Sequence, residues 1–258
     1  MTITAVITEY NPFHNGHLYH IQKARELTSA DYIIAIMSGN YVQRGAPALI
    51  SKYERTNMAL ACGVDAVFEL PVLYATASAE IFATGAVSLM DQLGCVDYLC
   101  FGSEEGSLEN LKLCAKILLK EPSPWKAHLQ EGLKNGKTFA KARNDAFSQC
   151  GYPIHEELLN NPNNILGIEY MKALMSRNSS IKPVTIKRIV TGYHDTSLAH
   201  TISSATAIRT ALQKNDNLAQ LKAAMPSPCY ETLLSCMNQN VTVDTNDLSA
   251  FLNYRLLR

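Results

Sequence analysis

Apolar residues in the first part of the chain fall into short unbroken runs separated by longer segments with helical spacing. The short runs, which are typical of strands covered on both faces, cover residues 3–8, 32–37, 66–70 and 98–101. Apolar positions three and four residues apart predict helices at 16–28, 51–62 and 78–93. Because strand and helix alternate, we expect an α/β fold built on a parallel sheet with right-handed crossovers.

The second half of the chain is mainly helical in pattern. Residues 107 to about 150 have helical spacing, with breaks at Pro122, Pro124 and the Asn135-Gly136 turn. One more strand is predicted at 182–190, where β-branched residues are frequent. Helices are predicted before it at 163–175, after it at 205–213, and on to residue 257.

Composition narrows the class of protein. The chain has 258 residues, of which 47% are hydrophobic and 18% charged, which is too apolar for a disordered chain and enough for a substantial core. No apolar run approaches the roughly 20 residues of a membrane span, and the start does not resemble a secretory leader. The seven cysteines form no C-x-x-C pair, which favours reduced core thiols. We expect a soluble, cytoplasmic protein with no membrane partner.

The net charge of zero conceals an uneven distribution. Residues 1–106 carry a net charge of −6, residues 107–145 carry +4, and residues 146–258 carry +2. In the basic middle segment Lys112, Lys116 and Lys120 recur at helical spacing and form one stripe. Such a stripe is usually a solvated helix face, and it is alternatively a surface that docks a phosphate backbone.

The most informative segment is EYNPFHNGH at residues 9–17, between the first strand and the first helix. His14 and His17 are three positions apart, so both imidazoles can face one point above the helix N-terminus, where anions bind. Gly16 lets a phosphate approach the backbone. Two imidazoles there can stabilise charge at an α-phosphate during adenylyl transfer. Paired histidines could instead cap the helix or bind a metal, with Glu9 as a further ligand.

Five blocks in order carry a resemblance to a known family. They are EYNPFHNGH at 9–17, MSGNYVQRG at 37–45, FGSE at 101–104, PNNILGIEY at 162–170 and ISSATAIR at 202–209. The H-x-G-H signature resembles the nucleotidyltransferase superfamily, and the whole set resembles the bacterial tRNA(Met) cytidine acetate ligases. The resemblance implies an α/β fold with a Rossmann-like parallel sheet of the nucleotidyltransferase type and added helices.

The same resemblance implies an activity and its partners. ATP would activate acetate as acetyl-adenylate, and the acetyl group would pass to the exocyclic amine of the wobble cytidine of elongator tRNA(Met). Because no carboxylate pair has metal-ligand spacing, we expect no protein metal site and Mg²⁺ that arrives with ATP. Two other functions stay open. The H-x-G-H signature also permits an adenylyltransferase acting on a small phosphorylated cofactor precursor, or a non-catalytic nucleotide-binding module that recruits RNA.

The resemblance assigns expected roles to individual residues. His14 and His17 are the expected catalytic residues, and His20 is expected on the helix surface beside the site. ATP contacts are expected at Ile7, Thr8, Glu9, Tyr10, Asn11, Pro12, Phe13, His14, Asn15, Gly16, His17, Leu18, Tyr19, His20, Gly102, Asn163, Arg188, Ser203, Ser204 and Arg209. Two further expectations rest on position and charge instead. The loop after the second strand, at the carboxyl edge, places acetate or the α-phosphate near Ser38, Gly39 and Arg44, and the basic stripe places tRNA near Lys112, Lys116 and Lys120.

The outlying ATP contacts have physical reasons. Gly102 closes the fourth strand, where adenine or ribose could lie against bare backbone. Asn163 can bond a base or ribose edge, although it could equally be a helix N-cap. Arg188 offers a planar fork to phosphate or a flat surface that can stack on adenine, although on its own it would be an ordinary surface arginine.

The second phosphate-binding signature of the superfamily corresponds to Ser203 and Ser204, with Arg209 on the following helix. Hydroxyls, backbone N–H groups and an arginine suit the β- and γ-phosphates, although a serine N-cap is the alternative.

Four segments are therefore predicted along the chain. Residues 1–106 would form the first part of a nucleotide-binding α/β core, and 107–160 a basic helical insertion. Residues 161–245 would complete the core with the second phosphate-binding motif, and 246–258 would begin a truncated C-terminal tRNA-binding domain.

Overall fold

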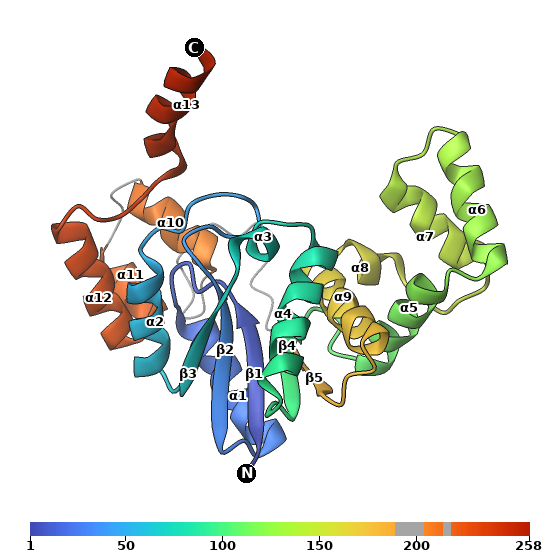
Figure 1. Ribbon diagram of the computed structural model, residues 1–258, viewed down its shortest axis with the longest axis horizontal. Coiled ribbons are helices and arrows are strands. Elements are labelled where there is room, and N and C mark those ends of the chain that lie inside the picture. The colour runs from blue at the N-terminus through green and yellow to red at the C-terminus, as the bar shows by residue number, and fades with distance from the viewer. Residues whose placement is uncertain (189–203, 214–217) are drawn as a thin grey trace.

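The protein is described by a computed structural model that covers residues 1–188, 204–213 and 218–258 (Figure 1). This part of the chain contains a five-stranded, fully parallel sheet in the order β3-β2-β1-β4-β5. The strands are β1 (Ile3–Thr8), β2 (Tyr32–Ser38), β3 (Ala66–Leu70), β4 (Tyr98–Ser103) and β5 (Lys182–Lys187). The predicted α/β fold with a parallel sheet is confirmed.

Helices connect the strands and extend beyond them. They are α1 (Asn15–Thr28), α2 (Lys52–Ala61), α3 (Val72–Ala75), α4 (Ala79–Leu93), α5 (Leu108–Lys120), α6 (Ser123–Lys134), α7 (Phe139–Gln149), α8 (Glu156–Asn160), α9 (Pro162–Ser176), α10 (Ala205–Gln213), α11 (Leu218–Ala224), α12 (Ser227–Asn238), the 3₁₀ helix η1 (Thr245–Leu248) and α13 (Ser249–Leu256).

Three of the differences from the predicted boundaries concern β4, α6 and β5. Strand β4 continues through Gly102 to Ser103, because Gly102 pairs with Ile186 of β5. Pro124 does not break a helix but lies in the first turn of α6, where its missing N–H has no intrahelical acceptor to lose. Strand β5 ends at Lys187, and the last two residues of the predicted strand lie outside the described residues.

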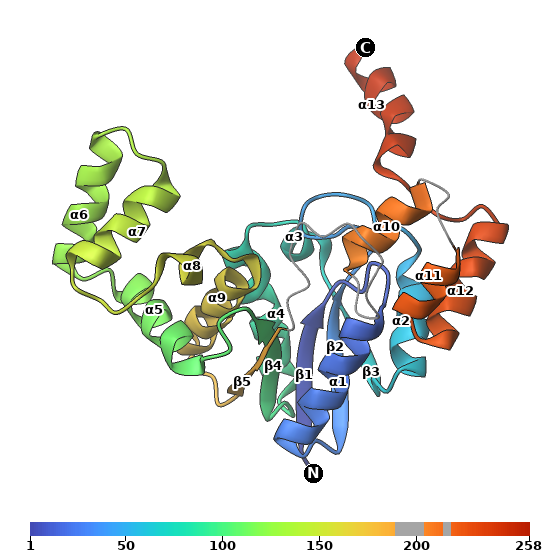
Figure 2. The same cartoon turned by 180° about the vertical axis from the view of Figure 1, so that it is seen from behind.

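Side chains alternate along each strand, so the sheet has two apolar faces. Different helices cover the two faces. Ala5 and Ile36 point to the face that packs against α4 and α9. Val6 and Ala35 point to the opposite face, which packs against α1 and α2. Strands covered on both faces explain the unbroken apolar runs in the sequence. Figures 1 and 2 show α4 and α9 on one side of the sheet and α1 on the other.

The strand order reverses direction beside β1. From β1 the chain proceeds outward to β2 and β3, then crosses back to place β4 on the other side of β1. In open parallel sheets, ligands bind outside the carboxyl ends of the strands at this reversal point. The turn after β1 and the start of α1, which carry His14 and His17, lie at this point.

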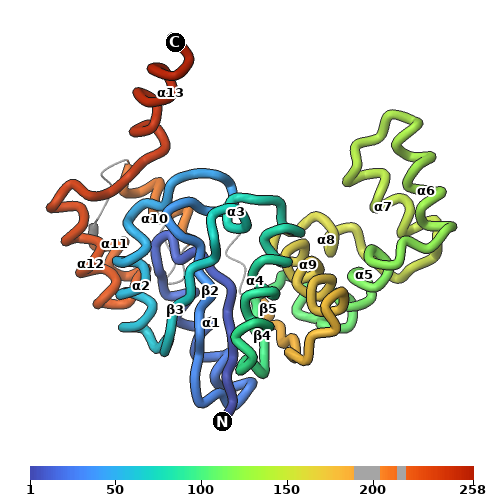
Figure 3. The backbone as a smooth tube through the Cα atoms, in the orientation of Figure 1, coloured from blue at the N-terminus to red at the C-terminus, as the bar shows by residue number. Residues whose placement is uncertain are grey.

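The remaining helices lie at the margins of the sheet. Helices α5, α6 and α7 lie beyond the β5 edge in both views, and α6 packs against α7 (Figures 1 and 2). The tube in Figure 3 shows the N-terminus at the amino end of the sheet and α13 at the far side of the molecule. Among the described residues no helix has the length and apolarity needed to cross a membrane.

Candidate functional site

His14 and His17 form a reciprocal cap at the start of α1. The Nδ1 atom of His14 accepts a hydrogen bond from the Gly16 N–H at 3.0 Å. The Nδ1 atom of His17 accepts one from the His14 N–H at 3.2 Å. The two rings stack with their centroids 3.6 Å apart. The capping interpretation of the motif is therefore present in the structure, and it brings both imidazoles to one place.

The cap also decides where the imidazole protons lie. A ring nitrogen that accepts a hydrogen bond carries no proton, so each neutral ring is protonated at Nε2. Burial lowers the pKa of His14 to about 3, and the charge of Arg188 acts in the same direction. Burial also holds the pKa of His17 well below its usual value, with smaller effects from His14, Arg188 and His20. At neutral pH both rings are uncharged, and each retains one Nε2–H donor.

His20, Gly102 and Arg188 lie on the same side of the sheet as the two histidines. His20 is half-buried rather than on the helix surface as expected, with its Nε2 3.8 Å from Sγ of Cys100 in β4. Burial lowers the pKa of His20 to about 4, again with a contribution from Arg188. The Arg188 side chain lies over Gly102, where a Cβ would come within 3.2 Å of its Cγ. The bare backbone of Gly102 therefore faces Arg188 in this structure.

Other residues of the segment 7–20 support the histidines by packing. Tyr10 and Phe13 are buried with ring centroids 4.7 Å apart. Their rings meet the edge of His17, at 4.9 Å and 5.5 Å. Asn15 donates from Nδ2 to the Ala223 carbonyl at 2.8 Å, which ties the start of α1 to α11. Pro12 is buried in the turn, whereas Ile7, Thr8, Leu18 and Tyr19 are partly buried.

Arg209 reaches this turn from α10. Its Nη1 donates to the Asn11 carbonyl at 2.6 Å. Burial lowers the pKa of Arg209, while the charge of Glu9 raises it and that of Arg44 lowers it. The Glu9 carboxylate accepts a hydrogen bond from the Gln43 N–H at 2.9 Å. The turn after β1, the loop after β2 and α10 therefore bring two arginines and one carboxylate together.

The serine pair before α10 is only half described. Ser204 is exposed and its Oγ accepts from the Ala207 N–H at 3.1 Å, which is the geometry of a helix N-cap. Ser203 lies outside the described residues.

Asn163 belongs to a network at the end of β4. Asn161 is the N-cap of α9, so Asn163 is free of that role. Its Nδ2 donates to Glu104 Oε1 at 2.6 Å, and the Asn164 N–H donates to Glu104 Oε2 at 2.9 Å. The Glu105 N–H donates to Asn164 Oδ1 at 2.9 Å. The FGSE and PNN blocks therefore meet, although sequence reasoning assigned no role to Glu104.

No role was assigned to Arg55 from the sequence either. Its side chain is fully buried and donates to carbonyl groups around Ser38 and Gly39, two of the expected substrate residues. A signal was available, because Arg55 stands three and four positions before Met58 and Ala59 on the apolar face of α2. A charged residue on a buried helix face requires a polar partner. The third expected substrate residue, Arg44, is exposed in the same loop.

The predicted basic stripe lies on α5, away from the start of α1. Lys112, Lys116 and Lys120 are exposed along α5. None of the three forms an ion pair within the described part of the chain. Helix α5 lies beyond β5 (Figure 1), so the stripe is a surface separate from the histidines.

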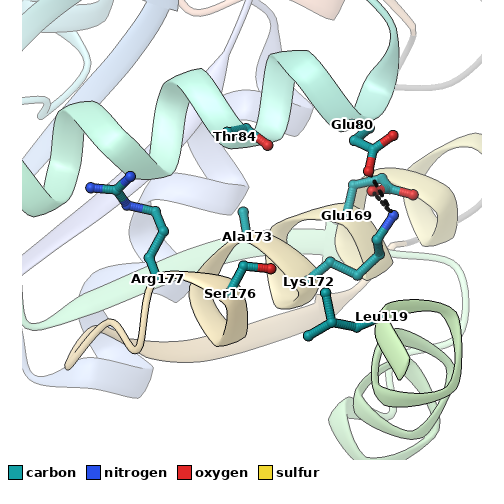
Figure 4. A pocket seen from close by; sticks show the side chains of 8 residues that line it. All are labelled: Glu80, Thr84, Leu119, Glu169, Lys172, Ala173, Ser176 and Arg177. Atoms are coloured by element: carbon teal, nitrogen blue, oxygen red, sulfur yellow. Dashed lines mark hydrogen bonds and ion pairs between the residues drawn. The ribbon is translucent and has the colours of Figure 1, made fainter. Parts of the chain in front are cut away.

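A small hollow lies elsewhere, between α4, α5 and α9 (Figure 4). Lys172, which lines it, pairs with Glu169 at 2.8 Å and Glu80 at 3.2 Å. Arg177 pairs with Asp91 at 2.5 Å. Because these cations already have carboxylate partners, the hollow is not a second anion site. Across the ranges that the structure describes, no group of three or more histidine, cysteine, aspartate or glutamate residues could hold a metal ion.

Comparisons with known proteins show the family of this chain. A family model described as HIGH Nucleotidyl Transferase matches residues 1–258. The tRNA(Met) cytidine acetate ligase of Clostridium novyi (strain NT) is 45% identical, over all of this chain and 65% of that protein. The protein of the same name from Caldicellulosiruptor bescii is 50% identical over 91% of this chain and 57% of that protein. The chain thus spans about three fifths of the length of these curated relatives.

Solved structures give the same result for the fold. Thermotoga maritima TmcAL bound with alpha-thio ATP is 40% identical, with a TM-score of 0.87 over 96% of this chain and 59% of that chain. The apo form of TmcAL has a TM-score of 0.90 at 41% identity, over 96% of this chain and 60% of that chain.

Proposed function

Because the chain belongs to the HIGH nucleotidyltransferase family, we propose that it carries the ATP site of a tRNA(Met) cytidine acetate ligase. Acetate is activated with ATP as acetyl-adenylate. The acetyl group then passes to the exocyclic amine of the wobble cytidine of elongator tRNA(Met). The names of the curated relatives and the ATP analogue bound to a relative at 40% identity support this proposal.

One observation carries the proposal for the site. The reciprocal cap leaves two neutral imidazoles stacked at a helix N-terminus with Nε2–H as their remaining donors. The first turn of α1 contains no acidic residue, so its positive dipole end is not neutralised. A triphosphate is the ligand whose charge and acceptor atoms match this arrangement.

The proposed reaction uses these groups. A carboxylate oxygen of acetate attacks the α-phosphorus, and the bond to the bridging oxygen of pyrophosphate breaks. His14 and His17 donate from Nε2 to α-phosphate oxygens, where negative charge increases in the transition state. Arg188, Arg209 and Arg44 are cations suited to the departing phosphates.

Acetyl transfer is the second step. The cytidine amine attacks the acetyl carbonyl, AMP leaves, and the amine loses one proton. No residue needs to form a covalent intermediate, so positioning and charge stabilisation supply the catalysis.

Three further roles belong to the proposal. The remaining ATP contacts are the segment 7–20 with Gly102, Asn163, Ser203 and Ser204, and acetate lies near Ser38 and Gly39. Mg²⁺ enters with ATP as its counter-ion. The stripe of Lys112, Lys116 and Lys120 contacts the tRNA backbone, and the enzyme acts in the cytoplasm.

The experiment that tests the function is isotope exchange between pyrophosphate and ATP. Exchange that requires acetate is expected, because only acetyl-adenylate formation can be reversed by pyrophosphate without tRNA. Exchange at the same rate without acetate contradicts the ligase. Formation of a product from a phosphomonoester acceptor would instead identify the cofactor adenylyltransferase, which the names of the relatives do not favour.

A further inference from the structure

Arg55 is a buried cation whose hydrogen-bond partners are backbone carbonyls. Its side chain lies on the apolar face of α2 and is 0% exposed. Nη1 donates to the Glu9 carbonyl at 2.5 Å and to the Ser38 carbonyl at 3.1 Å. Nη2 donates to the Gly39 carbonyl, and Nε to the Ile50 carbonyl at 3.4 Å. One guanidinium therefore joins the ends of β1 and β2 to the loop before α2.

No carboxylate forms an ion pair with Arg55 among the residues that the structure describes. Glu9 and Glu69 are the carboxylates whose charges act on it. Glu69 is instead paired with Lys52 at 2.6 Å, and Glu9 accepts from the Gln43 N–H. A buried charge whose hydrogen-bond partners are all peptide carbonyls is costly to maintain. A need to hold these carbonyls in one orientation would explain why the protein keeps Arg55 buried at this place.

The orientation of a carbonyl fixes the N–H of the same peptide group. In a trans peptide the C=O and N–H bonds point in opposite directions. The Glu9 and Gly39 carbonyls point to Arg55, so the Tyr10 and Asn40 N–H groups point away from it. Neither N–H has an acceptor among the described residues. Tyr10 begins the turn to the histidines, and Asn40 lies in the loop that carries Arg44.

We propose that Arg55 is a positioning residue of the nucleotide site, which holds the Tyr10 and Asn40 N–H groups as donors to a phosphate or carboxylate at the ends of β1 and β2. This inference rests on the proposed function and adds a residue that touches no substrate. Two N–H donors at this edge would act on the anionic part of the ligand and not on its base or ribose.

The test separates phosphate recognition from general stability. The dissociation constants of a non-hydrolysable ATP analogue and of adenosine are measured for the wild type, Arg55→Lys and Arg55→Met, together with thermal unfolding. Lysine keeps the charge but cannot span the carbonyls of two strands. Both variants are expected to bind the ATP analogue about tenfold or more weakly. Their affinity for adenosine is expected to stay within about twofold of the wild type, because adenosine has no phosphate for the N–H donors to bind.

Arg25 offers a matched control. Its guanidinium also joins carbonyls, at the amino edge of the sheet, by donating to Ala30, Asp31 and Gly63. Unlike Arg55, it forms an ion pair as well, with Asp65 at 2.8 Å. Arg25→Lys is expected to lower the melting temperature and to weaken neither ligand. An Arg55→Lys protein that binds the ATP analogue as the wild type does, or that loses adenosine and the ATP analogue equally, overturns the inference.

A second measurement needs no variant and covers the case in which Arg55 variants do not fold. Amide hydrogen exchange of Tyr10 and Asn40 in the wild type is expected to slow when the ATP analogue binds. Unchanged exchange at both amides, while the α1 amides respond, overturns the role of Arg55. A wild-type chain that binds no ATP analogue contradicts the proposed function itself, and the positioning role then falls with it.

Discussion

The imidazoles of His14 and His17 stack at an angle of 27° while each Nδ1 accepts a backbone N–H at the start of α1. The same two side chains thus cap a helix and present two Nε2–H donors. The capping role uses Nδ1 and the proposed chemical role uses Nε2, so substitutions can separate the two roles.

The chemical role of His17 is tested by its removal. His17→Ala is expected to slow acetate-dependent exchange by about 10²-fold to 10³-fold, or about 3 kcal/mol in barrier, because one charge-stabilising donor is lost. His128→Ala on α6 is the control and should exchange at the wild-type rate, since His128 lies in the helical region 107–160. Equal rates for wild type and His17→Ala would contradict the proposed role.

The capping role of His14 can be isolated by an asparagine. An asparagine Oδ1 can accept the Gly16 N–H but supplies no donor at the position of Nε2. His14→Asn should therefore keep the free energy of unfolding near the wild-type value and still lose exchange activity. His14→Ala should lose about 1 kcal/mol of stability in addition. Denaturant unfolding measures the stability of each variant, and the exchange assay measures its activity. A fully active His14→Asn protein would refute the prediction.

Stability should fall in mild acid. Burial depresses the pKa of His14 to about 3 and that of His20 to about 4 in the folded chain. The unfolded chain, with histidine pKa values near 6.5, binds more protons between these limits. The contribution of these histidines to the free energy of unfolding is fully present above pH 6.5. It decreases as the pH falls toward 4, by up to about 1.4 kcal/mol per pH unit for each histidine.

Urea unfolding at several pH values measures this decrease. The slope of the free energy of unfolding against pH should be smaller in His14→Asn, because one of the two titrating histidines is absent. A wild-type stability that is constant from pH 7 to pH 4.5 would show that the histidines are protonated in the folded state.

The network around Glu104 should matter for nucleotide affinity. Its carboxylate accepts from the Asn163 side chain and the Asn164 backbone. Asn163→Ala is expected to raise the dissociation constant of the ATP analogue about tenfold, as loss of a ligand hydrogen bond would. Glu104→Ala should have a similar effect because Asn163 loses its orienting partner. Calorimetric titration measures both, and wild-type affinity in Asn163→Ala would exclude a ligand contact.

The stripe on α5 should respond to salt. Replacing Lys112, Lys116 and Lys120 by glutamine is expected to weaken tRNA binding and to reduce the slope of log affinity against log salt by about 2 to 3. Lys126→Gln combined with Lys137→Gln is the control, because these lysines already pair with Glu121 and Asp145. An unchanged slope in the triple variant would leave the stripe as a solvated helix face.

The sequence was a good guide wherever a property depends on near neighbours. Helical and strand periodicity located β1, β2 and β3 closely, since burial on one or two faces imposes a spacing on the residues themselves. The H-x-G-H segment directly after β1 also predicted an anion site at the start of α1, and that site stays a prediction. His20 was misjudged because its burial comes from β4 and not from its own helix.

Contacts between distant segments depended on the order of the strands. Placing β4 beside β1 brings Gly102 and Arg188 to the histidines, and the join between α9 and β4 brings Asn163 to Glu104. The four carbonyls that Arg55 binds, from two strand ends and a loop, likewise come together only in the folded chain. Periodicity reports which face of an element is buried, and it contains no information about which element will cover that face.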